Sequence, residues 1–148
     1  MSCRFLSVIG LCCGLITTSV GAAPSPNYAV RLTADFHVQL QVSDSVLPDM
    51  FPGQCVVSGL VVRVFRDRTD TLEEGDKIKF VTLCTVMTPD FESTVISDAD
   101  ELTEARYLEL FLNPGLETDY DLAGHQYMVI KGATENPLCE TDSAGIKC

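Results

Sequence analysis

Two histidines are the side chains in this 148-residue chain that could act as a general base near neutral pH. His37 follows Asp35 by two positions, and a carboxylate, an imidazole and a serine hydroxyl together can form a nucleophilic triad. The sequence lacks the Gly-x-Ser-x-Gly turn that often presents such a serine. His37 also stands among Thr and Gln at the polar positions of an alternating segment, so we interpret it as a surface residue. We interpret His125, next to Gly124, in the same way and predict no catalytic residue.

A run of acidic residues offers hard oxygen ligands of the kind that calcium binds. It consists of Asp98, Asp100, Glu101 and Glu104. The run lacks the twelve-residue calcium loop with its glycine and its final bidentate glutamate. Acidic side chains are also favoured in the first turn of a helix, because the helix dipole is positive there. We therefore expect a helix start that Ser97 or Asp98 caps, and no metal site.

Three arginines form the basic cluster of the sequence: Arg63, Arg66 and Arg68. They could contact an anionic ligand or an acidic partner. Alternatively, they compensate the surrounding acidic side chains, since the acidic residues of 67–76 alternate with Arg66, Arg68 and Lys77. We favour charge compensation, and keep the three arginines as candidate ligand contacts.

A proline-rich segment, residues 43–53, is predicted to be a loop. It carries apolar side chains, among them Leu47, Met50 and Phe51. These side chains either form an exposed contact for another protein or cover one open end of a barrel. We favour the cover, and keep Phe51 as a candidate ligand contact.

The first 22 residues have the composition of a cleaved export signal. Arg4 precedes an apolar run over residues 5–16, and small residues precede a cleavage position after Ala22. The apolar run is shorter than the roughly 20 residues that a spanning helix needs. We expect residues 23–148 to form one domain, secreted or periplasmic, without a membrane anchor after cleavage.

Four cysteines remain after the signal is removed: Cys55, Cys84, Cys139 and Cys148. Disulfides persist in oxidising compartments, and four cysteines allow three pairings. A zinc site is the alternative, but no Cys-x-x-Cys pair is present to start one. We favour Cys55 with Cys84, which are expected to face each other from neighbouring strands, and Cys139 with Cys148, which would fix the C-terminal tail.

The chain is strongly acidic, with a formal net charge of −11. Removal of Arg4 with the signal leaves nine basic residues against 21 acidic ones, a net charge of −12. Nucleic-acid affinity comes largely from Lys and Arg that replace the counterions of the phosphates. We therefore expect neither a nucleic acid nor an anionic lipid surface as a partner, and we predict no cofactor.

Alternation of apolar and polar residues predicts a protein made mainly of strands. The first strand, residues 30–42, places apolar residues at every second position. Gly59 lies inside the second strand and predicts a bulge or bend there. The expected strands are residues 30–42, 55–66, 77–87, 107–112 and 120–131, with a short helix within residues 97–105.

Three strands, a short helix and two strands resemble the OB-fold, a five-stranded Greek-key barrel with a helix between strands 3 and 4. The matching features are the glycine in the second strand, the Gly75-Asp76 turn and the helix-like residues 97–105. Among exported OB-folds the chain is similar to netrin-like modules, a family that includes the tissue inhibitors of metalloproteinases. Those inhibitors use a cysteine at the mature N-terminus, whereas the expected N-terminus here is Ala23-Pro24-Ser25. That inhibitory element is therefore not carried over.

These patterns together predict a small all-β, OB-like domain that acts outside the cytoplasm as a non-catalytic binding or structural module. Another exported protein is the expected partner. Two alternatives remain: a small secreted or periplasmic hydrolase with a site around His37 or His125, and a calcium-stabilised structural protein.

Overall fold

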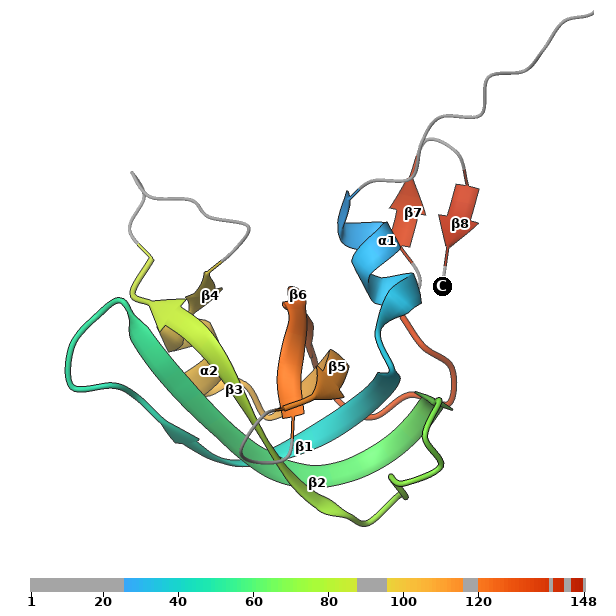
Figure 1. Ribbon diagram of the computed structural model, residues 1–148, viewed down its shortest axis with the longest axis horizontal. Coiled ribbons are helices and arrows are strands. Elements are labelled where there is room, and N and C mark those ends of the chain that lie inside the picture. The colour runs from blue at the N-terminus through green and yellow to red at the C-terminus, as the bar shows by residue number, and fades with distance from the viewer. Residues whose placement is uncertain (1–25, 88–95, 116–119, 139, 143–144, 148) are drawn as a thin grey trace, which may run out of the picture.

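The computed structural model describes residues 26–87, 96–115, 120–138, 140–142 and 145–147 (Figure 1). Strands dominate these residues, and both described helices are short. The elements are α1 (Pro26–Thr33), β1 (Phe36–Val46), β2 (Gly53–Asp67), β3 (Lys77–Thr85), β4 (Ser97–Asp98), α2 (Ala99–Glu104), β5 (Tyr107–Pro114), β6 (Tyr120–Ile130), β7 (Glu140–Asp142) and β8 (Gly145–Lys147).

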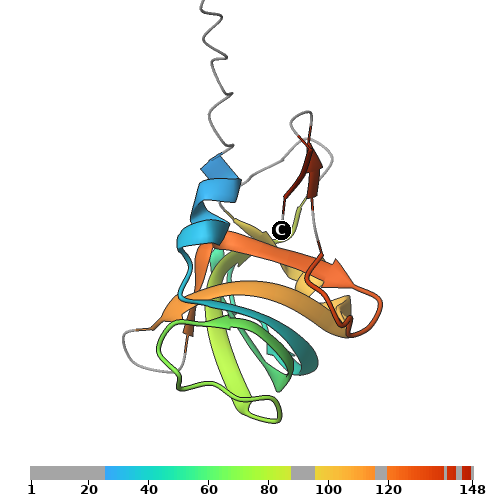
Figure 2. The same cartoon turned by 90° about the vertical axis from the view of Figure 1, so that its right-hand side faces the viewer.

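Five strands close into a barrel in the order β2-β1-β5-β6-β3, and pairing of β2 with β3 completes the circle. β3 and β6 run parallel, with Phe80 opposite Tyr120, while the other four pairings in the circle are antiparallel. α2 lies between the third and fourth barrel strands along the chain. Figures 1 and 2 show the long, curved β1 and β2 wrapping around the other strands. The predicted fold class, a five-stranded OB-like Greek-key barrel with a short helix, is confirmed.

The barrel core contains the inward-facing residues of each strand, because successive side chains in a strand point to opposite faces. Apolar side chains occupy those inward positions, and Leu102 of α2 joins the same cluster. The helix therefore adds to the core as well as connecting two strands. The core residues with almost no exposure include Phe36, Val38, Leu40, Val57, Val61, Phe80, Leu108, Leu110 and Leu112.

The segment before β1 is a helix, so the prediction of a single strand over residues 30–42 is wrong for its first part. Val30 of α1 and Ala34, which directly follows the helix, pack in one apolar cluster with Ala123 of the barrel. Leu32, on the other side of α1, is exposed. Over such a short stretch, apolar residues at every second position fit the period of a helix as well as that of a strand. Pro26 at the first helical position also favours the helix.

Gly59 lies where β1 and β2 change register, so the predicted bend is confirmed. A Cβ atom at this position would lie 2.2 Å from the backbone oxygen of Gln41. Two backbones approach each other here more closely than any side chain permits. The absence of a side chain at Gly59 thus allows β2 to curl around β1 and to pair with β3.

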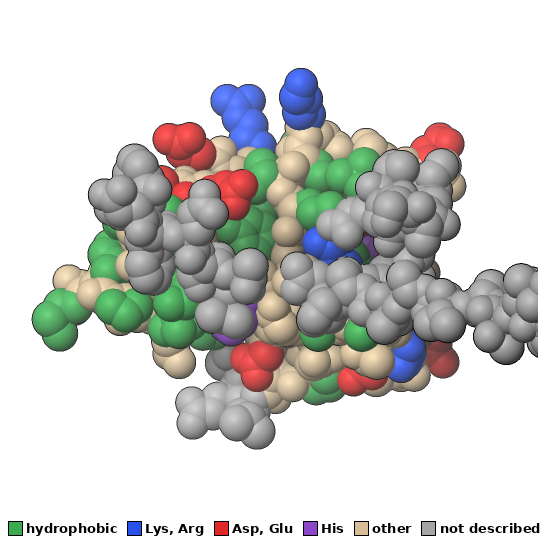
Figure 3. All heavy atoms as spheres, turned by 90° about the horizontal axis from the view of Figure 1, so that it is seen from above, with side chains coloured by type: hydrophobic (Ala, Val, Ile, Leu, Met, Phe, Trp, Pro, Cys, Tyr) green, Lys and Arg blue, Asp and Glu red, His purple; other side chains and the backbone are tan. Residues whose placement is uncertain are grey.

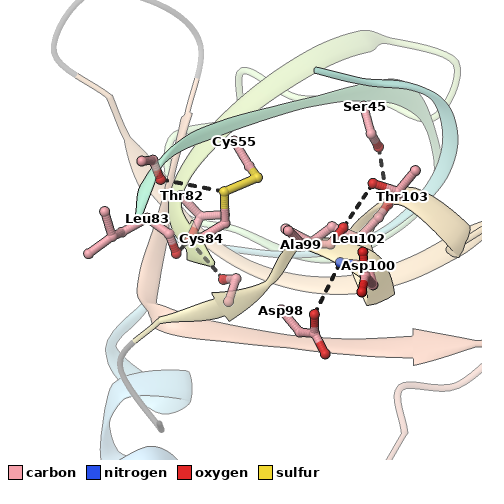
Figure 4. The surroundings of a disulfide bond; sticks show 12 residues. Ser45, Cys55, Thr82, Leu83, Cys84, Asp98, Ala99, Asp100, Leu102 and Thr103 are labelled. Carbon is pink, nitrogen blue, oxygen red and sulfur yellow. Dashed lines mark hydrogen bonds between the residues drawn. A yellow bond between two sulfur atoms is a disulfide. The ribbon is translucent and has the colours of Figure 1, made fainter. Parts of the chain in front are cut away.

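Cys55 of β2 and Cys84 of β3 form a disulfide, as predicted. Both residues are buried, and Figure 4 shows the bond close to α2 inside the barrel wall. Cys139 and Cys148 lie outside the described residues, so their pairing stays a prediction. None of the described helices combines the length and the apolar character needed to cross a membrane.

Candidate functional site

Three polar side chains on the outer face of β1 and β5 are buried: His37, Gln39 and Glu109. In the antiparallel register His37 lies opposite Phe111, and Gln39 lies opposite Glu109. His37 is only 6% exposed, so its interpretation as a surface residue is wrong. Alternation predicts which side chains face away from the barrel core, but it does not show what covers them.

Glu109 lies at the centre of this polar cluster with no exposed surface. Its Oε1 lies 2.7 Å from His37 Nε2, and its Oε2 accepts a hydrogen bond of 2.8 Å from Gln39 Nε2. The backbone N–H of Leu138 donates to both oxygens, at 3.1 and 3.2 Å. A buried carboxylate is tolerated only where such donors replace its water. The neighbouring residues therefore hold Glu109 in place tightly.

Aromatic rings flank His37 on two sides. Its ring stacks on Phe111 with centroids 4.3 Å apart and meets Phe65 of β2 at 5.0 Å. The guanidinium of Arg31 in α1 lies over the ring of Phe111, 5.2 Å from its centroid. The imidazole is thus fixed between two strands and shielded from solvent, which suits a structural or binding role better than proton transfer to a free substrate.

The chain that follows β6 covers the polar cluster. We call residues 131–138 the C-terminal strap; Figure 2 shows the chain leaving the end of β6 before the hairpin of β7 and β8. Thr134 N donates to Gln39 Oε1 at 2.8 Å, and Gln39 Nε2 lies 2.6 Å from Thr134 Oγ1. The side-chain amide of Gln39 thus pairs with the strap much as a backbone peptide unit would.

The second histidine belongs to a separate hydrogen-bonded chain. His125 Nδ1 lies 3.1 Å from Thr82 Oγ1, which lies 2.9 Å from Ser97 Oγ. Thr82 and Ser97 are buried, so neither hydroxyl is presented to a substrate as a nucleophile. His125 has a positive φ of 58°, which is uncommon for a residue with a side chain. Its contacts link β6 to β3 and β4 at the point where Gly124 and His125 have left-handed backbone.

The three arginines of the basic cluster have partners within the chain. Arg66 donates to the backbone oxygens of Arg31 and Leu32, and Arg68 donates to that of Leu32. These contacts satisfy carbonyl groups at the end of α1, where the helix dipole also favours cations. Burial, together with neighbouring Arg68, lowers the pKa of Arg66.

Arg63 lies 3.2 Å from the carboxylate of Glu74, an exposed ion pair. The expected local compensation of charge therefore occurs at this arginine. A ligand contact by Arg63, Arg66 or Arg68 stays a prediction, because their observed contacts are intramolecular.

The acidic run forms the start of α2, as predicted. Asp98 is the N-cap, and its side chain accepts a hydrogen bond from Asp100 N (Figure 4). The Tyr127 hydroxyl donates a hydrogen bond of 2.6 Å to Glu101. Burial raises the pKa of Tyr127 most, and this hydrogen bond raises it further. Among the described residues, no group of three potential ligands is close enough to hold a metal ion.

The β1–β2 loop carries exposed apolar side chains. Met50 is 80% exposed and Phe51 is 40% exposed, and neither belongs to the core. The structure therefore does not support the interpretation of this loop as a cover over the barrel end. Figure 3 shows hydrophobic side chains gathered at the end of the molecule that carries this loop.

The adjoining strands extend the exposed apolar surface of the loop. Val46, Val56 and Val81 lie side by side across β1, β2 and β3. They face outward, since Cys55 and Val57 of β2 are buried on the inner side. Leu83 follows two positions after Val81 and is also exposed. We define the apolar patch as Val46, Leu47, Met50, Phe51, Val56, Val81 and Leu83.

A pocket of about 230 Å³ lies next to the apolar patch. Ser58 and Leu60 of β2 line it together with Lys77 of β3, opposite Leu60 in the sheet. Sequence reasoning singled out the loop residues but missed the strand part of the patch and this pocket. Only the register between three strands brings these residues together.

No protein-family model matches the sequence, and no curated protein matches it significantly.

Proposed function

We propose that this protein is an exported, non-catalytic binding module that holds another exported protein on its apolar patch. The observation that carries the proposal is the exposure of Met50 and Phe51 at the tip of the β1–β2 loop, next to an outward-facing row of valines. Contiguous exposed apolar side chains are typical of docking surfaces, and a few large side chains usually supply most of the binding energy.

The charge around the loop indicates the kind of surface that the partner presents. Asp44 and Asp49 lie in or beside the loop, and the sequence contains no Lys or Arg between Arg31 and Arg63. Acidic residues at the loop end of the patch steer a basic surface toward it and repel phosphates, while Lys77 and Lys79 lie at the other end, along β3 from Val81. The expected partner has an apolar depression that receives Met50 and Phe51, with Lys or Arg around it.

Export is supported by two independent features. The disulfide between Cys55 and Cys84 is typical of oxidising compartments, and residues 1–22 have the composition of a cleaved signal. The resemblance to netrin-like modules leads to the same expectation of a binding domain outside the cytoplasm. The inhibitory cysteine of that family has no counterpart at the expected mature N-terminus.

The test is quantitative capture from the exported protein fraction of the source cells. The variant is Met50→Ser with Phe51→Ser, and the matched control is Val129→Ser, which changes an exposed apolar side chain of β6 outside the patch. We expect wild type and control to capture the same partner equally, and the double variant to capture at least about tenfold less, because each anchor contributes about 1 kcal/mol or more.

Two results would contradict the proposal. One is a partner captured equally by the double variant. The other is sedimentation with phosphatidylcholine vesicles that wild type shows and the double variant loses, since the loop would then be a membrane contact. Circular dichroism establishes that all variants are folded before capture is compared.

A further inference from the structure

The C-terminal strap covers a fully buried carboxylate although the strap itself buries little apolar surface. Ala133, Glu135 and Asn136 are exposed, and the one large apolar side chain at its end, Leu138, is 39% exposed. Beneath the strap, Gln39 and Glu109 have no exposed surface. Hydrogen bonds with these two side chains hold Thr134 and Leu138 of the strap.

A segment held in this way opens more easily than the barrel does. Local opening is least costly where few apolar contacts are lost and the freed polar groups can be hydrated. Release of the strap would let water reach Glu109, which removes part of the free-energy cost of burying its charge. β1 and β5 keep their own pairing and their own core contacts in the open form.

The polar cluster binds main-chain N–H groups and one hydroxyl, which a segment of another protein with the same bend as the strap can also offer. Glu109 accepts a main-chain N–H with both oxygens, and Gln39 accepts a second main-chain N–H. Gln39 also donates to a hydroxyl, and that hydroxyl in turn donates to the backbone oxygen of Asn136. The two bound residues of the strap are Thr134 and, four positions later, Leu138, whose main-chain N–H donates to Glu109.

We propose that the outer face of β1 and β5 is a peptide-binding site, which the C-terminal strap fills within the same chain. Its ligand from outside is a segment of another protein that adopts the bent conformation of the strap, which turns at residues 135–136. That segment has Thr or Ser at the position of Thr134 and a residue other than proline at the position of Leu138. The segment binds by replacing the strap. The site uses a different part of the barrel surface from the apolar patch and does not depend on the function proposed above.

The strap competes with any such ligand at high effective concentration. It is joined directly to β6, and short connections give effective concentrations on the order of millimolar. The intact protein therefore binds a free peptide weakly. A variant with a released strap binds the same peptide more tightly, because the competing segment is gone.

The first test measures binding of a fluorescein-labelled peptide with the strap sequence KGATENPL by fluorescence anisotropy, using the full-length chain. Thr134→Pro removes both the N–H and the hydroxyl that Gln39 binds, and so releases the strap. We expect this variant to bind the peptide at least about tenfold more tightly than wild type. A control peptide with proline in place of its threonine should bind at least about tenfold more weakly, and so should the double variant Thr134→Pro with Gln39→Leu.

The second test uses hydrogen exchange in the wild-type protein and needs no variant. The amides of Thr134 and Leu138 should exchange at least about 100-fold faster than those of Leu40 and Leu110 in the barrel. Equal protection would overturn the proposal, because the strap would then open only when the whole domain unfolds. Equal affinity of the released variant for the two peptides, or no binding of either, would also overturn it.

Discussion

At the scale of single residues, one carboxylate organises the connection between β2 and β3. Asp67 accepts hydrogen bonds from the backbone N–H groups of Thr69, Thr71 and Leu72 and from the Thr69 hydroxyl. Burial by itself raises the pKa of Asp67, but these hydrogen bonds, with that from Leu72 foremost, outweigh it and lower the pKa to about 2. Hydrogen bonds from backbone N–H groups to Asp67 therefore order this acidic turn, in addition to the ion pair between Arg63 and Glu74.

We expect Asp67→Asn to lower the free energy of unfolding by about 1 kcal/mol at pH 7, because the amide nitrogen cannot accept the bonds to one carboxylate oxygen. The folded-state pKa lies below the ordinary 3.8, so this stabilisation is complete above about pH 4 and is lost as the pH falls through about 2. The difference between wild type and variant should therefore shrink toward pH 2.

Urea denaturation at pH 7, 5, 3 and 2 measures this difference. Asp70→Asn, in the same exposed turn, is the matched control for the loss of one negative charge. A gap between wild type and Asp67→Asn that stays constant from pH 7 to pH 2 would argue against the assignment of the low pKa to Asp67.

At the scale of elements, α1 depends on a glycine in the strand that it covers. Gly124 of β6 has φ of 52°, and a Cβ atom there would lie 2.8 Å from Val30 Cγ1. Gly124 therefore serves two purposes, a left-handed backbone in β6 and room for the helix. Two arginines also hold the C-terminal end of α1 through its last carbonyl groups, close to Val30.

We expect Gly124→Ala to destabilise the protein by about 2 kcal/mol, from about 1 kcal/mol of backbone strain and a similar contribution from the displaced Val30 side chain. Gly75→Ala shares the positive φ but has open space around it, so it should cost about 1 kcal/mol. Gly132→Ala has neither feature and should cost close to nothing. Thermal and urea unfolding of the three variants measure the order, and equal losses at Gly124 and Gly75 would mean that contact with α1 adds nothing.

At the scale of the whole molecule, closure of the barrel relies on pairing between segments far apart in sequence. β1 joins β5, and β3 joins β6 through a short parallel contact. The disulfide ties β2 to β3 near the apolar patch, where Gly53 lies opposite Cys84. The disulfide therefore restrains the two strands that carry Val56 and Val81 of the patch, which lowers the entropy cost of binding a partner there.

Removal of the disulfide tests this cross-link. We expect Cys55→Ala with Cys84→Ala to lower the free energy of unfolding by about 3 kcal/mol, because the bond closes a loop whose ends are 29 residues apart. Replacing both residues avoids a new unpaired thiol. Denaturation with and without a reducing agent measures the effect, and the reducing agent should leave the double variant unchanged. A loss below about 1 kcal/mol would show that other contacts already restrain these strands.

Much of the barrel was predictable because its signals are local. Gly59, the alternation in β2 and β3, and the cap at Asp98 each act within a few residues, and each prediction is confirmed. The predicted pairing of Cys55 with Cys84 also followed from local alternation, which places Cys84 on the inner face of its strand. The prediction failed at α1, where a short stretch fits both the helix period and the strand period. It also failed at His37, where a segment distant in sequence covers the outer face of the strand.

The sequence by itself determined the fold class, the positions of most strands, the disulfide between β2 and β3, and the acidic net charge. These properties depend on residue type, local spacing and net charge. Only the tertiary structure decided that His37 and Glu109 meet beneath the strap, that Arg66 and Arg68 cap α1, and that the loop residues continue into a patch across three strands. Each of these arrangements depends on pairing or packing between segments distant in sequence, and local patterns do not specify which segments meet.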